Sequence, residues 1–272
     1  MKLRLAILDL NAGLPNQGMR CISEIVSNYH HLLEVDVFDV RVTAEVPDLS
    51  YDIYISSGGP GNPMEGDGVW DERFYTLIQD VWEYNKYEGH PKKYFFFICH
   101  SFQMACLHFG LGKITKRKSA SFGVQPVHKT RAGQKDSIFN GLPDPFYVVE
   151  SRDWQLVQPN LHIFTEKGAE ILALEKIRTH VEYERAIMAV RFSEEMVGTQ
   201  FHPEADPHGM KVHFTLEANR DKVINNFGIA KYDSMMAQLD EEDKIALTYK
   251  TILPKFIENS IKLINSHAYS IV

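Results

Sequence analysis

A cysteine, a histidine and a glutamate in this chain of 272 residues could together form a nucleophile site. Cys99 directly follows five apolar or aromatic residues, 94–98, and the next apolar residues recur at helical spacing as far as Gly110. This pattern predicts a buried strand that turns sharply into a helix, with the thiol at the turn. Such a turn places a nucleophile at the carboxyl edge of a sheet, beside helix N–H groups that favour a thiolate. A small buried structural cysteine is the alternative for this stretch alone.

His202 and Glu204 could supply the partner that such a nucleophile requires. They follow a predicted strand, 196–201, and are separated by Pro203. Residues two apart in an extended segment project from the same face, so Glu204 can reach the imidazole of His202. Pro203 keeps His202 out of the helical region. An oriented histidine can raise the thiolate fraction of a cysteine and then return a proton to the leaving group. In isolation, the tripeptide would be a surface histidine beside a surface glutamate.

A glycine-rich loop, Ser57-Gly58-Gly59-Pro60, follows the predicted strand 51–56. Gly58 and Gly59 let backbone N–H groups approach a ligand closely, and Pro60 fixes the turn. The loop could therefore hold an anion or a developing oxyanion. It is not a P-loop, because no Gly-Lys-Ser/Thr follows it. A plain surface turn is the alternative.

The elements that must position these residues alternate between strand and helix. Apolar runs predict strands at 3–10, 32–42, 51–56 and 94–98, and helical stripes cover 19–26 and 70–87. Alternation of this kind predicts a parallel sheet wound by helical crossovers. Short strands at 146–149, 171–174, 186–192 and 196–201 follow, the middle two antiparallel. The segment 112–131 is polar and basic, and its four basic residues within 113–118 are predicted as a solvated edge, with a binding surface as the alternative. One helix is predicted from Asp206 to about Asn226, and 232–266 is amphipathic and helical.

Composition excludes several classes of partner. The net charge of −7 argues against a nucleic acid or an anionic membrane surface as the main partner. No apolar run is long enough to span a bilayer. The twelve histidines lack metal-ligand spacing, so neither a metal site nor a cofactor is expected. Three widely spaced cysteines, an odd number, predict free thiols in a reducing, cytoplasmic setting.

Together, the three stretches resemble the class I, triad-type glutamine amidotransferase family, and in particular GMP-synthase-like glutaminases. The resemblance covers residues 1 to about 225. The family's Gly-x-Cys-x-Gly-x-Gln motif is matched at Cys99 and Gln103, with Phe97 and Ser101 in place of the two glycines. The family's Ser/Asn-Gly-Pro loop is matched at 57–60, and its Gln-Phe-His-Pro-Glu is matched unchanged at 200–204.

The resemblance implies a fold and a division of the chain. The expected fold is α/β and flavodoxin-like, with a mainly parallel central sheet, helices on both faces and extra C-terminal helices. Residues 1–228 would form the amidotransferase-like domain, and residues 229–272 a helical extension packed on it.

The resemblance also implies roles for individual residues. Cys99 would attack the side-chain amide of glutamine and form a thioester, His202 would act as base and then as acid, and Glu204 would orient His202. Backbone N–H groups of Gly59 and His100 would stabilise the oxyanion. The residues expected to contact the substrate are Gly58, Gln103, Phe122, Gly123, Val124 and Arg152. Phe97 and Ser101 imply a strained or reshaped elbow.

Partner and substrate stay open at this stage. The chain has no ATP-pyrophosphatase signature, so the ammonia acceptor would be a separate synthase subunit, or the protein would be a stand-alone hydrolase of γ-glutamyl compounds. A homo-oligomer is a further option. Ile98-Cys99-His100 also resembles the elbow of DJ-1/PfpI proteins, which use the neighbouring histidine. A non-catalytic module on the same fold is the last alternative, motivated by Phe97 and Ser101.

Overall fold

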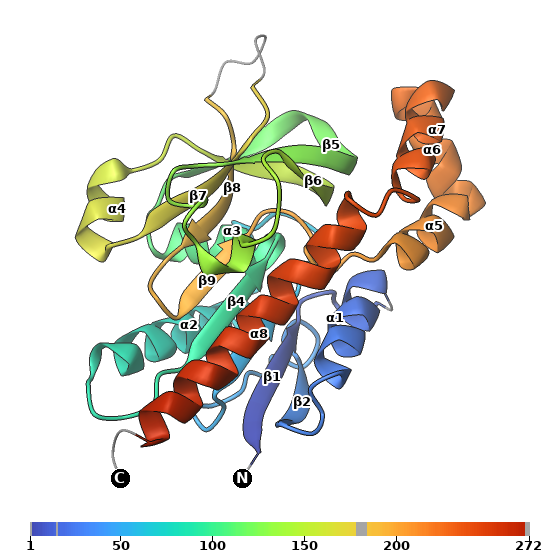
Figure 1. Cartoon of the computed structure of the whole chain (residues 1–272). Helices are drawn as coiled ribbons and strands as arrows, with labels where there is room; N and C mark the ends of the chain where they lie inside the picture. The colour runs from blue at the N-terminus through green and yellow to red at the C-terminus, as the bar shows by residue number, and fades with distance from the viewer. Residues whose placement is uncertain (1, 15, 178–183, 270–272) are drawn as a thin grey trace.

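A computed structural model of the chain describes residues 2–14, 16–177 and 184–269. In this part of the chain, nine strands form one sheet in the order β2-β1-β3-β4-β9-β8-β7-β5-β6 (Figure 1). Strands β2 to β9 in this order pair in parallel, and β9 to β6 pair antiparallel. The strands are β1 (Leu3–Asp9), β2 (Leu33–Asp39), β3 (Ile53–Ser56), β4 (Tyr94–Ile98), β5 (Lys113–Lys129), β6 (Phe146–Val157), β7 (Glu170–Glu175), β8 (Ile187–Arg191) and β9 (Met196–Thr199).

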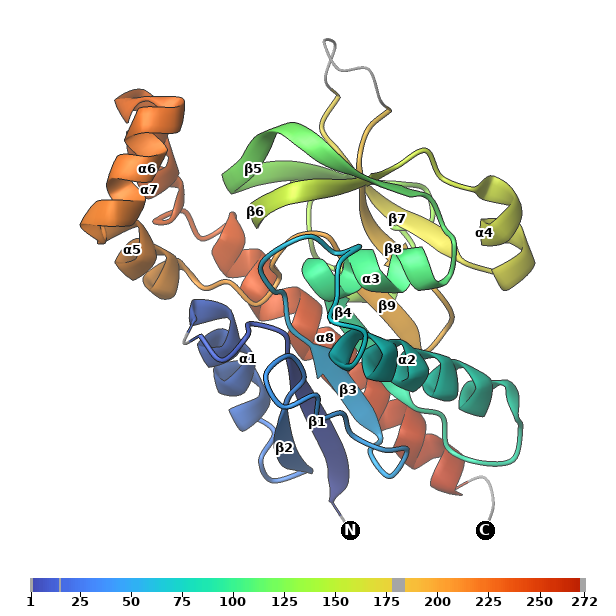
Figure 2. The ribbon, with the colours of Figure 1, turned by 180° about the vertical axis from the view of Figure 1, so that it is seen from behind.

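Helices cover both faces of the parallel half of the sheet. Figures 1 and 2 show α1 and α8 on one face and α2 and α3 on the other. The helices, including the short 3-10 helix η1, are α1 (Gln17–Ser27), α2 (Trp70–Lys86), α3 (His100–His108), η1 (Ser137–Phe139), α4 (Leu161–Lys167), α5 (Pro207–Thr215), α6 (Glu217–Phe227), α7 (Ile229–Gln238) and α8 (Ile245–Tyr269). The predicted α/β sheet with helices on both faces is confirmed.

The central strand β4 explains why residues 94–98 form a continuous apolar run. Phe96 packs into the core beneath α1 and α8, whereas Phe95 and Phe97 pack into the core beneath α2 and α3. All five residues of β4 are buried. A parallel strand covered on both faces needs apolar residues at every position, not at alternate positions. β4 therefore ends in the interior of the protein, and Cys99, which follows it, lies at the carboxyl edge of the sheet.

Segment 112–131 corrects the predicted set of strands, because it forms the 17-residue strand β5. It pairs antiparallel with β6, and the register shifts between Lys116 and Ser121. Ile114, Val124 and Val127 are buried, and Lys113, Lys116 and Lys118 are exposed, whereas the side chain of Arg117 is buried beside Glu175. The irregularity interrupts the two-residue period, which hides the strand from a search for alternation.

The C-terminal helices correct a second prediction, since the single helix expected over 206–226 is broken at Leu216. The hydroxyl of Thr215 donates to the carbonyl of Lys211, and the side chain of Asn219 donates to the carbonyl of His213. These bonds satisfy carbonyls at the end of α5, so the chain can leave the helix with an extended ψ of 125° at Leu216.

Helix α8 lies along the sheet and completes its core. Ile252, Phe256 and Ile257 of α8 pack in the same apolar cluster as Leu5 and Phe96 of the sheet. Helices α5 to α7 form a smaller cluster with the β5–β6 strands instead. The predicted boundary at residue 228 stays a prediction. No helix in the described residues is long and apolar enough to cross a membrane.

Candidate active site

Cys99 lies at a sharp turn between β4 and α3. Its backbone has φ +50° and ψ −97°, in the left-handed half of conformational space that residues with a side chain rarely adopt. Its N–H donates to the carbonyl of Thr199 at 2.8 Å, and its carbonyl accepts from the N–H of Gln103 at 3.0 Å. The neighbouring strand and the first turn of the helix thus both fix the strained residue, as in a nucleophile elbow.

Phe97 and Ser101 fit this elbow without leaving a polar group unpaired. The hydroxyl of Ser101 accepts from the N–H of Ile98 at 2.9 Å and lies 3.1 Å from the carbonyl of Ser56, to which it can donate. It therefore links the ends of β3 and β4. The ring of Phe97 packs edge-on against Phe192, with centroids 5.5 Å apart. The side chain of Ser101 thus contributes hydrogen bonds to the interior, and the side chain of Phe97 contributes apolar packing.

His202 reaches Cys99 from the segment that follows β9. Its N–H donates to the carbonyl of Val149 at 3.0 Å, which anchors the segment to β6. Its Nδ1 lies 2.8 Å from Oε1 of the buried Glu204. Burial by itself lowers the pKa of His202, but the charges of Glu204 and Cys99 and hydrogen bonds to both side chains raise that pKa well above its usual value. The imidazole therefore pairs with the carboxylate of Glu204 and lies close to Cys99.

The glycine-rich loop packs directly on this pair. A Cβ added at Gly58 would lie 2.9 Å from Cε1 of His202 and 3.5 Å from Cβ of Cys99. A Cβ at Gly59 would lie 2.4 Å from the carbonyl oxygen of Leu10, which is backbone and cannot easily yield. Glycine is therefore required at both positions by close approach.

Arg41, which follows β2, joins the glycine loop to the start of α3. Its Nη1 donates to the carbonyl of Pro60 at 2.8 Å, and its Nη2 donates to Nε2 of His100 at 2.6 Å. The guanidinium stacks over the ring of Trp70, 4.7 Å from its centroid. Burial, with the positive charge of Arg41 beside it, lowers the pKa of His100 to about 3. The His100 imidazole is therefore neutral, with Nε2 as the acceptor.

The depressed pKa of His100 predicts a dependence of stability on pH. The unfolded chain takes up a proton near the usual pKa of 6.5, whereas folded His100 takes one up only near pH 3, so stability falls as pH falls between these values. From pH 7 to pH 5 this residue should lower the free energy of unfolding by about 2 kcal/mol. Urea unfolding of wild type and His100→Gln at both pH values measures the difference. If the free energies of unfolding of wild type and His100→Gln differ by the same amount at pH 7 and at pH 5, a neutral, buried His100 is contradicted. His208→Gln, at an exposed position, is the control.

Two glutamine side chains lie beside Cys99. Nε2 of Gln200 lies 3.9 Å from Sγ of Cys99, and Nε2 of Gln103 donates to Oε1 of Gln200 at 3.0 Å. Both side chains are buried. Gln103, a predicted substrate contact, is thus linked to the sulfur through Gln200.

A cavity of about 1240 Å³ opens over these groups. Its lining includes the predicted residues Gly58, Gly59, Cys99, His100, Gln103, Phe122, Arg152, His202 and Glu204. Two other residues predicted to contact the substrate lie behind the residues that line the cavity. Gly123 packs against Met235 of α7, where an added Cβ would meet the side chain at 2.6 Å, and Val124 is buried in the cluster shared with α5 to α7.

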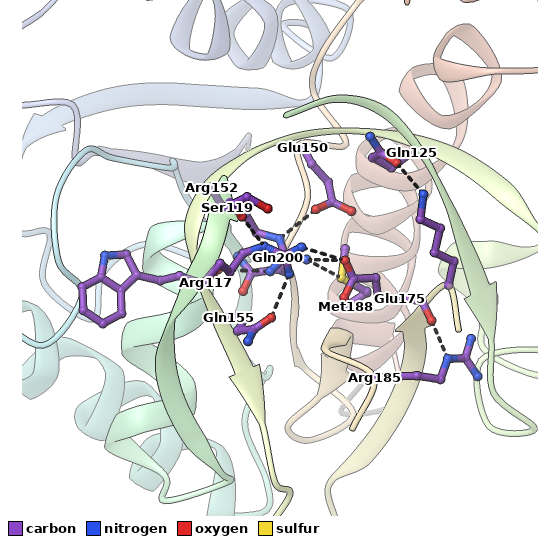
Figure 3. Close-up of polar contacts among 12 residues, drawn as sticks. Arg117, Ser119, Gln125, Glu150, Arg152, Gln155, Glu175, Arg185, Met188 and Gln200 are labelled. Carbon is purple, nitrogen blue, oxygen red and sulfur yellow. Dashed lines mark hydrogen bonds and ion pairs between the residues drawn. The ribbon is translucent and has the colours of Figure 1, made fainter. Parts of the chain in front are cut away.

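Arg152 sits in an internal network of charges between β5, β6 and β7 (Figure 3). Its side chain is 1% exposed, its Nε donates to Glu150 at 2.8 Å, and its Nη2 lies 3.5 Å from Glu175. Arg117 also contacts Glu175, at 3.2 Å, and donates to Gln155. The guanidinium of Arg152 therefore already has carboxylate partners inside the protein. Its contact with a substrate carboxylate stays a prediction.

Arg41 and Gln200 are site residues that sequence reasoning did not single out. Gln200 offered a signal, because it belongs to the same Gln-Phe-His-Pro-Glu motif as His202 and Glu204. Arg41 offered none, since it follows an exposed strand 59 residues before its partner His100. A single basic residue at such a position usually faces solvent.

The fold and this elbow define an α/β protein of the flavodoxin-like type. The family model for glutamine amidotransferase class-I matches residues 18–218, and the chain belongs to this family. The resemblance inferred from residues 57–60, 97–103 and 200–204 is thereby confirmed. Membership supports hydrolysis of the glutamine amide as the general activity.

Solved structures with the same fold agree. One is a glutamine amidotransferase from Thermotoga maritima, with 18% identity and a TM-score of 0.70 over 96% of this chain and 99% of that one. A protein described as belonging to a GMP synthase of Thermoplasma acidophilum has 19% identity and a TM-score of 0.53, over 87% and 98%. The CTPS glutaminase domain of Trypanosoma brucei with bound acivicin has 13% identity and a TM-score of 0.56, over 75% and 86%. No curated protein matches the sequence.

Proposed function

We propose that this protein hydrolyses the side-chain amide of glutamine through Cys99, His202 and Glu204, with a glutamyl thioester as intermediate. The observation that supports this most strongly is the position of His202. Its imidazole pairs with Glu204 and lies close enough to Cys99 for that residue to raise the imidazole's pKa, and all three residues line the same cavity. A nucleophile, a base and a group that orients the base are the parts that acyl transfer to a thiol needs.

In each half of the proposed reaction, His202 takes up one proton and gives it back. His202 takes the thiol proton, and the sulfur of Cys99 attacks the amide carbon, giving a tetrahedral oxyanion. His202 returns the proton to the amide nitrogen, the C–N bond breaks, and ammonia leaves. Water then adds to the thioester with His202 as base, which releases glutamate and restores the thiol. The charge of Glu204 favours the imidazolium in both steps.

Backbone N–H groups of Gly59 and His100 are the proposed oxyanion donors. Loss of one such donor typically raises the barrier by about 3 kcal/mol. Arg41 contacts both segments that carry these donors, through the carbonyl of Pro60 and the imidazole of His100. It would therefore act as a positioning residue without touching the substrate.

The Arg41→Lys variant is expected to lower kcat by roughly tenfold with little change in KM, because one ammonium cannot hold two acceptors as a planar guanidinium does. Steady-state glutamate release measures both constants. Arg73→Lys is the matched control, since Arg73 also donates to a backbone carbonyl but outside the site. An unchanged kcat in Arg41→Lys would contradict this role.

The seat of the substrate's α-amino and α-carboxyl groups is proposed along Gln103, Phe122 and the β6 segment that holds Arg152. All three residues line the cavity. Gly58 would pack against the amide, and Gly123 and Val124 would support the wall behind Phe122. The ammonia acceptor is proposed to be a separate synthase subunit, and the setting to be cytoplasmic. A homo-oligomer stays a prediction.

The direct test is an assay of the purified chain with glutamine, in which glutamate and ammonia should appear in equal amounts. Hydroxylamine added to the assay should divert part of the product to γ-glutamyl hydroxamate, because it attacks a thioester faster than water does. Absence of glutamate formation, both alone and with candidate synthase subunits, would contradict the proposal.

A γ-glutamyl peptide hydrolase with the same three residues is the second candidate. The size of the cavity favours it, since about 1240 Å³ lies above the range of roughly 300–1,000 Å³ that holds drug-sized ligands. Free glutamine and γ-glutamyl dipeptides, compared as substrates, separate the two candidates.

A further inference from the structure

The carboxylate of Glu204 is buried, but its own hydrogen bonds hold it on one side only. Its Oε1 pairs with Nδ1 of His202 at 2.8 Å. Its Oε2 has no hydrogen-bond partner among the residues that the structure describes. A carboxylate whose bond goes to the imidazole alone does not fix that imidazole in the protein, because the two side chains can shift together. The backbone on either side of Glu204 therefore has to fix the pair.

The segment 202–206 is anchored at both of its ends. At its start, the N–H of His202 donates to the carbonyl of Val149 in β6 at 3.0 Å. At its end, Nη2 of Arg20 in α1 donates to Oδ1 of Asp206 at 2.6 Å. The side chain of Asp206 is only 13% exposed, so this ion pair is largely shielded from water. Glu204 lies midway between the two anchors, two residues from each.

The guanidinium of Arg20 is itself held from several directions. Its Nε donates to Gln17 at 2.6 Å, and its Nη1 pairs with Glu24, one turn further along α1, at 2.6 Å. Gly209, near the start of α5, leaves room for it, since an added Cβ would lie 2.3 Å from Nη2. A planar guanidinium fixed in this way holds a carboxylate in one geometry. Arg20 thus joins α1 to the start of α5, which lies above α1 in Figure 1.

Helix α1 also bounds the carboxylate of Glu204 directly. A Cβ added at Gly18, in the first turn of α1, would lie 3.2 Å from Oε1 of Glu204. The carboxylate thus lies close to the N-terminus of this helix, where the partial positive charge of the helix favours an anion. If the segment 202–206 moved away from α1, Glu204 would leave this position and its bond to His202 would weaken.

We propose that Arg20 is a positioning residue for the reaction: by holding Asp206 against α1, it keeps Glu204 in the place from which it orients His202. This inference rests on the proposed function, because it concerns the same acyl transfer. Arg20 is not among the described residues that line the cavity, so it acts through Asp206 and Glu204 without touching the substrate.

The first test is glutamate release by Arg20→Met, which keeps a long side chain on α1 but removes the charge. Displacement of a reacting group by about 1 Å can cost about a hundredfold in rate, so kcat should fall at least about tenfold with little change in KM. Asp206→Asn should have the same effect, because the amide can still cap α5 but no longer carries the charge that pairs with Arg20. A kcat like that of wild type in either variant would overturn the inference.

Arg191→Met is the matched control. Arg191 also holds a helix-capping aspartate, since its Nη2 donates at 2.8 Å to Asp136, the cap of η1. Neither residue lines the cavity. The variant therefore loses the same kind of ion pair away from the site and should keep the kcat of wild type.

A double-variant cycle separates positioning from a general loss of stability. Glu204→Gln changes the group through which Arg20 acts, so adding Arg20→Met to it should lower kcat by less than about twofold. Thermal unfolding shows that each variant is folded at the temperature of the assay. A loss from Arg20→Met that is equally large with Glu204 and with Gln at this position would overturn the inference.

The pKa of His202 tests the positioning without any turnover. Burial lowers this pKa, and the charges of Glu204 and Cys99 raise it, so Cys99→Ala leaves Glu204 as the charge that raises it. NMR titration of the imidazole should give a lower pKa in Cys99→Ala/Arg20→Met than in Cys99→Ala, because a displaced Glu204 stabilises the imidazolium less. Loss of the positive charge of Arg20 alone would instead raise the pKa, so the sign identifies the cause.

The same titration separates failure of the positioning from failure of the proposed function. A lower pKa of His202 without Arg20, in a protein that does not hydrolyse glutamine, would support the positioning and contradict the proposed function. A pKa that is equal or higher without Arg20, with a wild type that releases glutamate, would overturn the positioning and leave the proposed function standing.

Discussion

Replacing Cys99 with alanine is expected to lower glutamate release from glutamine by roughly 10⁴-fold or more, because the thioester cannot form and the residual binding groups contribute little on their own. The fold should be kept. Cys99 is held by backbone hydrogen bonds to Thr199 and Gln103, which alanine retains. Alanine is also smaller than cysteine, so no neighbour has to move. A coupled glutamate assay, with thermal unfolding as a check on folding, measures both effects.

The matched control is Cys106→Ala, on the same helix as the elbow. Cys106 is fully buried, and burial raises the pKa of its thiol well above the usual value, so it is inert. This variant should lose about 1 kcal/mol of stability through the small cavity it leaves and keep its activity. Retention of more than a few per cent of activity in Cys99→Ala would show that another group forms the acyl intermediate, or that none does.

Replacing His202 with glutamine is the second large expected effect. Glutamine can keep a hydrogen bond to Glu204 but cannot accept and return a proton at neutral pH, so kcat should fall by roughly 10²–10⁴-fold. The exposed His208→Gln, a few residues along the chain, should behave as wild type. Intact activity in His202→Gln would favour the alternative in which His100, next to the cysteine, is the histidine used. A neutral His100 bonded to Arg41 already argues against that alternative.

His202 also has a stability signature of defined sign. Its pKa in the folded protein is raised, so its protonation stabilises the fold fully below the unfolded value near 6.5, and the contribution fades as pH rises through the folded value. Unfolding of His202→Gln and wild type at pH 6 and pH 9 should therefore differ more at pH 6. The pH dependence of His100 has the opposite sign, which makes the two histidines distinguishable.

The residues at the centre of the candidate site could be predicted from the sequence, because the neighbouring residues determine the local conformation of each one. Cys99 follows a run of apolar residues that predicts a buried strand, and Pro203 keeps His202 out of the helical region, within reach of Glu204. The glycine loop is set by close approach that only glycine allows. Local chemistry of this kind can be inferred from one chain.

The features of the fold and of the candidate site that the sequence does not indicate depend on contacts between segments distant in the chain. Arg41 meets His100 only because β2 and β4 lie in one sheet, and nothing near Arg41 in the sequence announces it. Strand β5 is hidden by its register shift, and the break at Leu216 by side-chain bonds from Thr215 and Asn219. That break turns the chain so that α6 forms a wall of the cavity, which no periodicity of residues 206–226 could indicate.

Whether His202 activates the sulfur of Cys99 is tested most directly by the rate and site of modification by an electrophilic glutamine analogue at neutral pH, followed by mass spectrometry of the whole chain and of its peptides. One adduct is expected, on Cys99, and it should form at least about a hundredfold more slowly in His202→Gln. Modification of Cys21 or Cys106 at the same rate, or a rate on Cys99 that His202→Gln leaves unchanged, would contradict it.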